Sequence, residues 1–156
     1  MNKYLLTIFF SMLPISEVRG GIPFAMSQGI AFPLSFFLPM ISNMIIVPPL
    51  LFMVEPLFRF LRRHHVFEKL ISAYEKRASE KIEKHLKFKK WALFIFVGIP
   101  LPTTGVYTAV VASILAGVKA REAMLPLIFG VLVSASLTYM AAHGLLGVFN
   151  LIFTKF

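Results

Sequence analysis

Four long apolar stretches constrain this chain more than any other feature of its sequence. They are Tyr4 to Ile15, Ile22 to Val54, Trp91 to Val118 and Ala123 to Thr154. A helix that crosses a bilayer needs about 20 consecutive apolar residues, so the stretches provide for three or four crossings. Only 15 % of the 156 residues are charged, whereas about a quarter are charged in a soluble domain. The sequence therefore predicts an all-α, polytopic integral membrane protein that forms one domain, residues 1–156.

Two short segments rich in proline and glycine interrupt the apolar stretches. PISEVRGGIP covers residues 14–23 and GIPLPTTG covers residues 98–105. Proline removes a backbone donor and clashes with the preceding helical turn, and glycine permits turns, so we expect the helices to break here. The residues predicted to make these structural helix breaks are Pro14, Pro23, Pro100 and Pro102.

The helical arms on either side of the breaks are short. They cover residues 4–13, 24–31, 91–99 and 105–117, which is 8 to 13 residues each. Arms of this length do not cross a bilayer alone. We predict two re-entrant hairpins, residues 4–31 and 91–118, whose broken backbone is buried against protein or lines a wet cavity.

Charge placement predicts the order of the elements in the membrane. Eleven of the 16 Lys and Arg residues lie within residues 59–90, and basic segments between spans are typical of the cytoplasmic side. Lys119 and Arg121 have the same preference, so the chain between these basic groups should return to the side on which it began. Helices over residues 33–56 and 123–142 would then make the two full crossings.

The two halves of the chain are predicted to be inverted repeats, each a hairpin followed by a transmembrane helix. The first repeat is residues 1–56 and the second is residues 91–156. GIAFPLSFFLP at 29–39 resembles GVKAREAMLP at 117–126 once one residue is inserted. Inverted repeats whose broken helices meet near the membrane midplane are a transporter design.

Residues 57–90 are predicted to form a basic amphipathic helix that joins the repeats on the cytoplasmic side. Its apolar residues recur at intervals of three and four, the period of one helical face. Such a helix can dock on the bundle as a connector, lie on the lipid surface or act as a gate, and its role stays open. Nothing in it resembles a nucleic-acid reading motif, so we expect no nucleic-acid partner.

Glu17 and Arg19 are the first candidate functional residues, because an ionisable residue at membrane depth costs at least about 2.5 to 3.5 kcal/mol and usually faces a cavity or a partner. In the functional interpretation Arg19 binds an anionic group and Glu17 carries the coupling proton. Gly20 and Gly21 then allow the substrate to approach the backbone closely. In the structural alternative, the two charges only neutralise each other.

The second motif carries no charge. Thr103, Thr104 and Gly105 offer two hydroxyls and an open backbone at the start of a half-helix, so we predict that they bind substrate. A threonine here is also an ordinary N-cap, and the two roles are compatible. Pro23 would open a half-helix in the first hairpin in the same way, and the unpaired N–H groups at such helix ends attract anions.

The rest of the sequence argues against an enzyme. There is no cysteine for thiol chemistry, and His64 and His65 lack a carboxylate cluster for a metal site. No glycine-rich phosphate loop or paired nucleophile and base is present, so we predict no catalytic residue, metal or cofactor. His143 is open to two interpretations, a proton relay or an interfacial residue, and Asn43 is a candidate buried hydrogen-bonding residue within a span.

The EVRGGIP segment after a short apolar arm, and the PLPTTG turn after the basic segment, resemble those of the small multidrug export proteins of bacteria and archaea. That family is distantly similar to the DedA and VTT membrane proteins. The resemblance implies a multi-pass protein of the plasma membrane with two facing re-entrant hairpins, and an activity that moves lipids such as polyprenyl phosphates across the bilayer. Glu17 and Arg19 match the acidic and basic positions of the first hairpin, and the second turn is matched by Pro100, Pro102 and Gly105. The second hairpin has no arginine, so the two-arginine phosphate clamp of the DedA pattern is not expected.

Three functions stay open. We favour translocation of an anionic membrane lipid such as a polyprenyl phosphate, because Arg19 and the helix N-termini would repel a cation. The alternatives are proton-coupled export of small lipophilic cations and a non-transport scaffold that works through the basic helix. Two crossings and two hairpins are few helices to enclose a pathway, so we expect a homodimer, while substrate identity, coupling ion and direction stay open.

Overall fold

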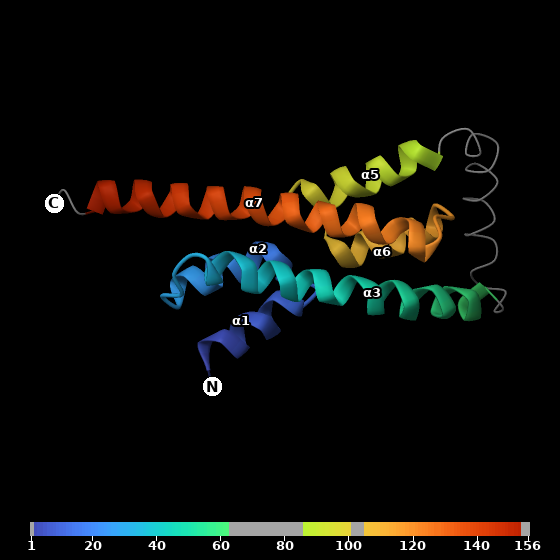
Figure 1. Cartoon of the computed structure of the whole chain (residues 1–156), viewed down its shortest axis with the longest axis horizontal. Helices are drawn as coiled ribbons and strands as arrows, with labels where there is room; N and C mark the ends of the chain where they lie inside the picture. The colour runs from blue at the N-terminus through green and yellow to red at the C-terminus, as the bar shows by residue number, and fades with distance from the viewer. Residues whose placement is uncertain (1, 63–85, 101–104, 154–156) are drawn as a thin grey trace.

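The computed structural model describes residues 2–62, 86–100 and 105–153 of the chain, and in these ranges it is all-helical, with six helices and no strand. This confirms the predicted fold class. The order of the helices along the chain is shown in Figure 1. They are α1 (Lys3–Met12), α2 (Glu17–Ser27), α3 (Leu34–Arg62), α5 (Leu86–Gly98), α6 (Val106–Leu115) and α7 (Ala120–Phe153). Most of the predicted connector helix, residues 57–90, lies outside the described residues.

Two of the helices, α3 and α7, are long and apolar enough to cross a membrane. The apolar part of α3 is Leu34–Val54, with 21 residues and a mean hydropathy of 2.0, and that of α7 is Ala120–Gly144, with 25 residues and a mean hydropathy of 1.8. The two helices pack against each other and run side by side along the long axis of the molecule (Figure 1). Their positions agree with the two crossings predicted over residues 33–56 and 123–142.

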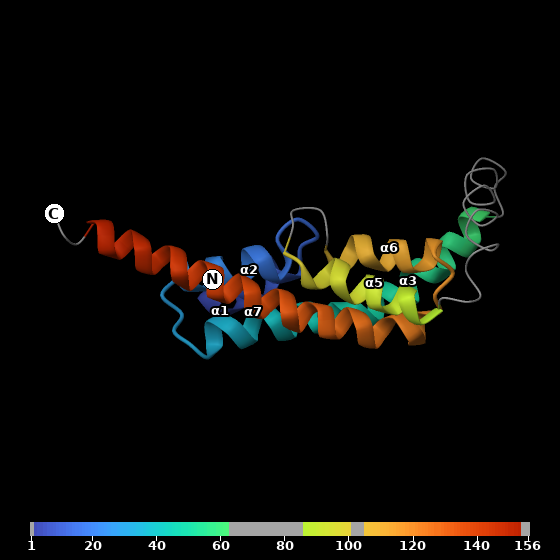
Figure 2. The ribbon, with the colours of Figure 1, turned by 90° about the horizontal axis from the view of Figure 1, so that it is seen from above.

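The four shorter helices form two hairpin-like pairs, α1 with α2 and α5 with α6. In Figure 2 the turn between α1 and α2 lies close to the end of α5 and the start of α6, near the middle of the molecule. The open ends of the two pairs point toward opposite ends of the long axis (Figure 1). The two helical breaks of the sequence therefore meet at one place, on one side of the two long helices (Figure 2).

The first break differs from the prediction. Pro14 lies in the turn between α1 and α2, but α2 begins at Glu17 and continues through Pro23 to Ser27, so Pro23 does not break the helix. Four more prolines lie inside α3. Prolines in membrane helices are tolerated where neighbouring helices and side chains satisfy the freed carbonyl groups, and this explains why proline alone misplaced the break. In the second motif Pro100 follows α5, whereas Pro102, Thr103 and Thr104 lie outside the described residues.

Helices α2 and α6 end in the same way. Gly29 and Gly117 have positive φ angles of 66° and 70°. After α2, the Ile30 N–H donates to the Ala25 carbonyl at 3.1 Å, and after α6 the Val118 N–H donates to the Ser113 carbonyl at 2.9 Å. Both are glycine C-caps of the Schellman type, which need a residue without a Cβ. These glycines open the two segments that resemble each other in the sequence.

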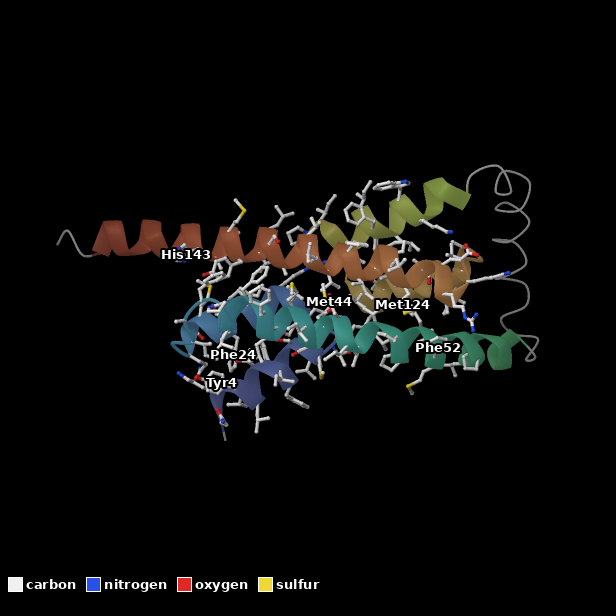
Figure 3. The ribbon with its side chains drawn as sticks, viewed as in Figure 1. Tyr4, Phe24, Met44, Phe52, Met124 and His143 are labelled. Atoms are coloured by element: carbon white, nitrogen blue, oxygen red, sulfur yellow. The ribbon has the colours of Figure 1, made fainter. Side chains whose placement is uncertain are left out.

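The core lies between α3 and α7 and extends to the short helices. Its fully buried side chains include Ile22, Val47, Leu51, Val97, Val106, Val110, Leu127 and Val131. Met44 of α3 and Met124 of α7, both labelled in Figure 3, pack against this core. Small residues let the helices approach: a Cβ on Gly21 would overlap the Ser11 side chain, and one on Gly130 would lie 2.7 Å from the Val97 Cβ. Close packing at small residues is the usual way in which membrane helices associate.

A buried polar contact joins α1 to α3. Asn43 is fully buried, and its Nδ2 donates to the Ser11 carbonyl at 3.1 Å. The hydroxyls of Thr7 and Ser11 donate to carbonyls one turn earlier in α1. The expectation that Asn43 hydrogen-bonds within a span is therefore confirmed, and the bond fixes α1 against a long helix.

Candidate functional site

The two helix pairs are tied together at their breaks by a tyrosine. Tyr107 lies in the first turn of α6, and its hydroxyl donates a hydrogen bond to the carbonyl oxygen of Met12, the last residue of α1. This carbonyl belongs to the end of a helix, where the last carbonyl groups have no partner within the helix. The start of α6 is thus attached to the end of α1.

Glu17 makes a second connection at the same place. Its side chain is only 6 % exposed, and its carboxylate Oε1 accepts a hydrogen bond from the Tyr107 N–H at 3.4 Å. The first N–H groups of a helix lack intrahelical partners and carry a partial positive charge, so a carboxylate is stabilising there. Glu17 begins α2, yet its carboxylate caps α6. It holds this position with a φ of 48°, a left-handed conformation that is strained for a residue other than glycine.

Gly105 provides the space that the carboxylate occupies. It is the N-cap of α6, and a Cβ built on it would overlap both oxygens and the Cδ of the Glu17 carboxylate. Its own N–H donates to the hydroxyl of Thr108 at 3.0 Å, in the manner of a capping box. The need for glycine here comes from close approach, because the Gly105 φ of −99° is open to any residue.

Arg19 contacts the C-terminal end of a helix, whereas Glu17 contacts an N-terminal end. Its Nη2 donates to the carbonyl oxygen of Ile99 at 3.5 Å, directly after the end of α5. The Ile99 N–H still bonds back to Ile95, so Ile99 continues the helical turn. Terminal carbonyl groups carry the partial negative charge of the helix and favour a cation. The carboxylate and the guanidinium of one short motif therefore meet the start of α6 and the end of α5, each at the end of opposite charge.

These residues line a cavity of about 480 Å³ at the meeting point of the two pairs. That volume lies within the range of pockets for small organic ligands. Its lining combines the charged side chains of Glu17 and Arg19 with apolar residues. Its lining residues are Pro14, Ile15, Ser16, Glu17, Arg19, Gly20, Pro100, Gly105, Tyr107 and Thr108.

The predicted site residues separate into three groups. The cavity brings together Glu17, Arg19, Gly20 and Gly105. Gly21 does not line it, because it faces Ser11 and Pro39 in the packing between helices. Thr103 and Thr104 lie outside the described residues, so their predicted contact with substrate stays a prediction.

Four lining residues were not singled out in the sequence as part of the site: Ile15, Ser16, Tyr107 and Thr108. Thr108 had a visible signal, because a hydroxyl three residues after a cap position is the spacing of a capping box. Tyr107 had none, because its partners Glu17 and Met12 lie more than 80 residues earlier in the chain.

His143 lies away from the cavity. Its ring stacks on that of Tyr139, one turn earlier in α7, with the ring centroids 5.7 Å apart. Figure 3 shows His143 near the C-terminal part of that helix. It is not among the lining residues, so the structure gives no support for a proton relay to Glu17. Among the described residues there is also no group of three or more His, Asp or Glu side chains that could hold a metal.

Comparison with known proteins gives a match to a family. The family model described as "Putative small multi-drug export protein" matches residues 17–137, which begin at Glu17 and include the whole cavity-lining part of the second motif. No curated protein and no solved structure matches the chain significantly. The distant similarity to the DedA and VTT proteins stays a prediction.

Proposed function

The chain belongs to the small multi-drug export protein family, and on that basis we propose that it is a transporter that exports small lipophilic cations in exchange for protons, with Glu17 as the coupling carboxylate. The observation that carries this proposal is a buried carboxylate that lines the cavity between the two helix pairs. The family description supports export by a membrane protein rather than enzymatic catalysis. We further propose a multi-pass location in the plasma membrane of a bacterium or archaeon.

The proposed architecture is two inverted repeats, α1–α2–α3 and α5–α6–α7, in which each short pair is a re-entrant hairpin. Three observations support it: the pairs open toward opposite ends of the molecule, their breaks meet in the middle, and α2 and α6 share the same glycine cap. Transporters with this design bind substrate where the broken helices meet. Here that place is the cavity of Glu17 and Arg19.

Proton coupling follows from the competition for one carboxylate. An ionised Glu17 attracts both the first turn of α6 and a cation in the cavity. A proton on Glu17 removes the charge, so it weakens both attractions at once. Proton binding would therefore release the cation and loosen the contact between α2 and α6, as exchange transport requires.

The position of Glu17 also favours a cationic substrate over an anionic one. An anionic lipid was favoured from the sequence because helix N-termini attract phosphate. The start of α6 is already occupied by the Glu17 carboxylate, which leaves less positive potential for a phosphate. Cation export is now better supported than lipid translocation.

Translocation of an anionic lipid, such as a polyprenyl phosphate, remains the second candidate because Arg19 lines the same cavity. In this case the guanidinium would leave the Ile99 carbonyl and bind the phosphate bidentately. The scaffold function is the third candidate, and it leaves the cost of burying Glu17 without an explanation. A homodimer stays part of the proposal, because the described helices are few for enclosing a complete pathway.

Transport in proteoliposomes distinguishes the candidates. An ethidium-type lipophilic cation and a labelled polyprenyl phosphate would be followed in separate vesicles with and without a pH gradient. Cation movement that depends on the gradient and is lost in Glu17→Gln, but kept in Glu122→Gln, would support cation export. Movement of the phosphate lipid that is lost in Arg19→Ala would support lipid translocation. Movement of neither would favour the scaffold.

A further inference from the structure

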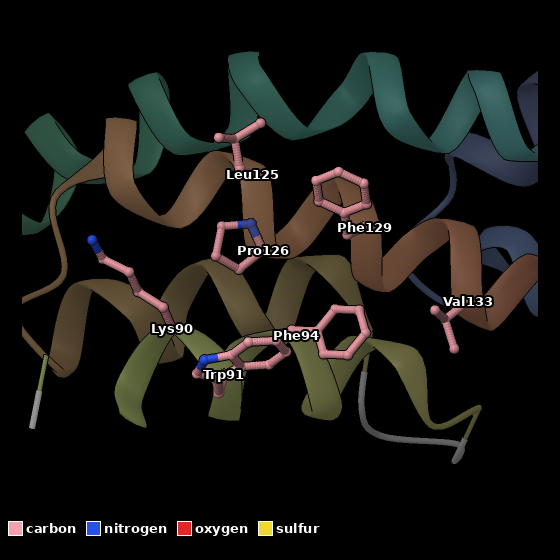
Figure 4. A pocket seen from close by; sticks show the side chains of 7 residues that line it. All are labelled: Lys90, Trp91, Phe94, Leu125, Pro126, Phe129 and Val133. Atoms are coloured by element: carbon pink, nitrogen blue, oxygen red, sulfur yellow. The ribbon is translucent and has the colours of Figure 1, made fainter. Parts of the chain in front are cut away.

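A second cavity lies on the outer face of α5 and α7, away from Glu17 and Arg19. It measures about 430 Å³ and is lined almost entirely by apolar side chains. Its lining residues are Lys90, Trp91, Phe94, Leu125, Pro126, Phe129 and Val133, and all seven are labelled in Figure 4. We refer to it as the α5–α7 groove.

The groove is open and apolar along most of its length. The four residues from α7 follow a helical spacing and form one stripe, and two of them, Leu125 and Phe129, are 62 % and 56 % exposed. Trp91 on the facing helix is 64 % exposed. Exposed apolar side chains of this size, on and beside a helix that is long and apolar enough to cross a membrane, are suited to contact with acyl chains.

One end of the groove carries a cation. Figure 4 shows Lys90 at this end and Val133 at the opposite end. The Lys90 Nζ lies 3.0 Å from the Glu122 Oε2, and both side chains are about one third exposed, at 36 % and 32 %. An ammonium has three donors, so one ion pair leaves it able to bind a further oxygen. Lys119 and Arg121 are both exposed and flank the start of α7 beside Glu122, so positive charge exceeds negative charge among the described residues at the start of α7.

The apolar groove and its cationic end are complementary to an amphiphile with a negatively charged head group. The apolar groove begins beside Lys90, and the next residue, Trp91, lines it. Membrane proteins place tryptophan at the level of the lipid headgroups. We propose that the α5–α7 groove binds an anionic phospholipid, with an acyl chain along the groove between Trp91 and Phe129 and the phosphate at Lys90. This site is independent of the proposed transport activity, because it shares no lining residue with the cavity of Glu17.

Trp91 allows a direct test, since it is the only tryptophan of the chain. The protein would be reconstituted in bilayers that contain a small fraction of phospholipid with brominated acyl chains, which quench tryptophan at contact. Brominated phosphatidylglycerol and brominated phosphatidylcholine would be compared at equal fractions. A lysine near an anionic lipid contributes about 1 kcal/mol, so we expect the anionic lipid to bind beside Trp91 about fivefold more tightly than the zwitterionic one.

Two matched variants test whether Lys90 causes the preference for the anionic lipid. Lys90→Gln should bring the ratio close to one, whereas Lys119→Gln, at the same end but outside the groove, should keep most of it. The preference of the unmodified protein should also fall as salt is raised, a readout that needs no variant. Equal quenching by both lipids, or an equal loss in the two variants, would overturn the proposal. Absence of quenching by either lipid would also overturn it and would mean that a second copy of the chain covers the groove.

Discussion

The Glu17 carboxylate lies in the space that a Cβ on Gly105 would fill, so one residue from each helix pair fits against the other without room for a methyl group. This contact joins the start of α2 to the start of α6. It links Glu17, which with Arg19 is the only charged residue between Lys3 and Glu55, to the uncharged motif of the second half. Glu17 and Gly105 both line the cavity at which the two helix pairs meet.

Gly105→Ala should separate the two helix pairs. The added methyl group overlaps the carboxylate, and overpacking of this kind typically costs about 1 to 3 kcal/mol. We expect a lower thermal midpoint in detergent and loss of gradient-driven cation transport. Gly144→Ala is the control, because a Cβ there meets no atom within 4 Å. Equal midpoints for the two variants would show that the Glu17 side chain moves away without cost.

Glu17→Ala should be less stable than Glu17→Gly, although both lose the cap of α6. Glu17 has a φ of 48°, a left-handed conformation that costs roughly 1 kcal/mol or more for a residue with a Cβ and little for glycine. Thermal unfolding of the two purified variants measures this difference. Neither variant should transport cations. Greater stability of the alanine variant would mean that the backbone leaves the left-handed region when the carboxylate is removed.

Tyr107→Phe should weaken the attachment of α6 to the end of α1. The variant loses the hydrogen bond from the hydroxyl to the Met12 carbonyl, and a single such bond contributes about 0.5 to 1.5 kcal/mol. The thermal midpoint should fall slightly while the bond from the Tyr107 N–H to Glu17 is kept. Tyr4→Phe, at the exposed start of α1, is the control and should not change the midpoint.

Gly130→Ala should disturb the packing of α5 on α7. A Cβ at this position would lie 2.7 Å from the Val97 Cβ and 3.1 Å from the Phe94 carbonyl oxygen, and neither atom is the end of a flexible side chain. We expect a loss of about 1 to 3 kcal/mol in stability. Gly98→Ala lies on the same interface, but its Cβ would reach Val133 only at 3.5 Å, an ordinary contact. A comparison of the two midpoints should therefore show a loss for Gly130→Ala alone.

Much of the fold could be predicted from local patterns. The apolar stretches predicted the long helices α3 and α7, and the short arms predicted α1, α5 and α6. The position of the first break was wrong, because Pro23 lies inside α2 and does not end the helix. Proline removes a hydrogen bond from a helix, but the surrounding packing decides whether the helix continues in spite of that loss.

By itself the sequence determined the all-helical class and the two membrane-length helices, and it singled out Glu17 and Arg19 as candidate site residues, because length, hydropathy and charge within an apolar stretch are properties of single segments. Only the tertiary structure decided what these charges contact. Glu17 meets Tyr107, 90 residues later, and Arg19 meets Ile99, 80 residues later. No local pattern contains such pairs. Each charged side chain contacts a helix end of opposite partial charge that belongs to the other half of the chain. This contact depends on how the two long helices pack.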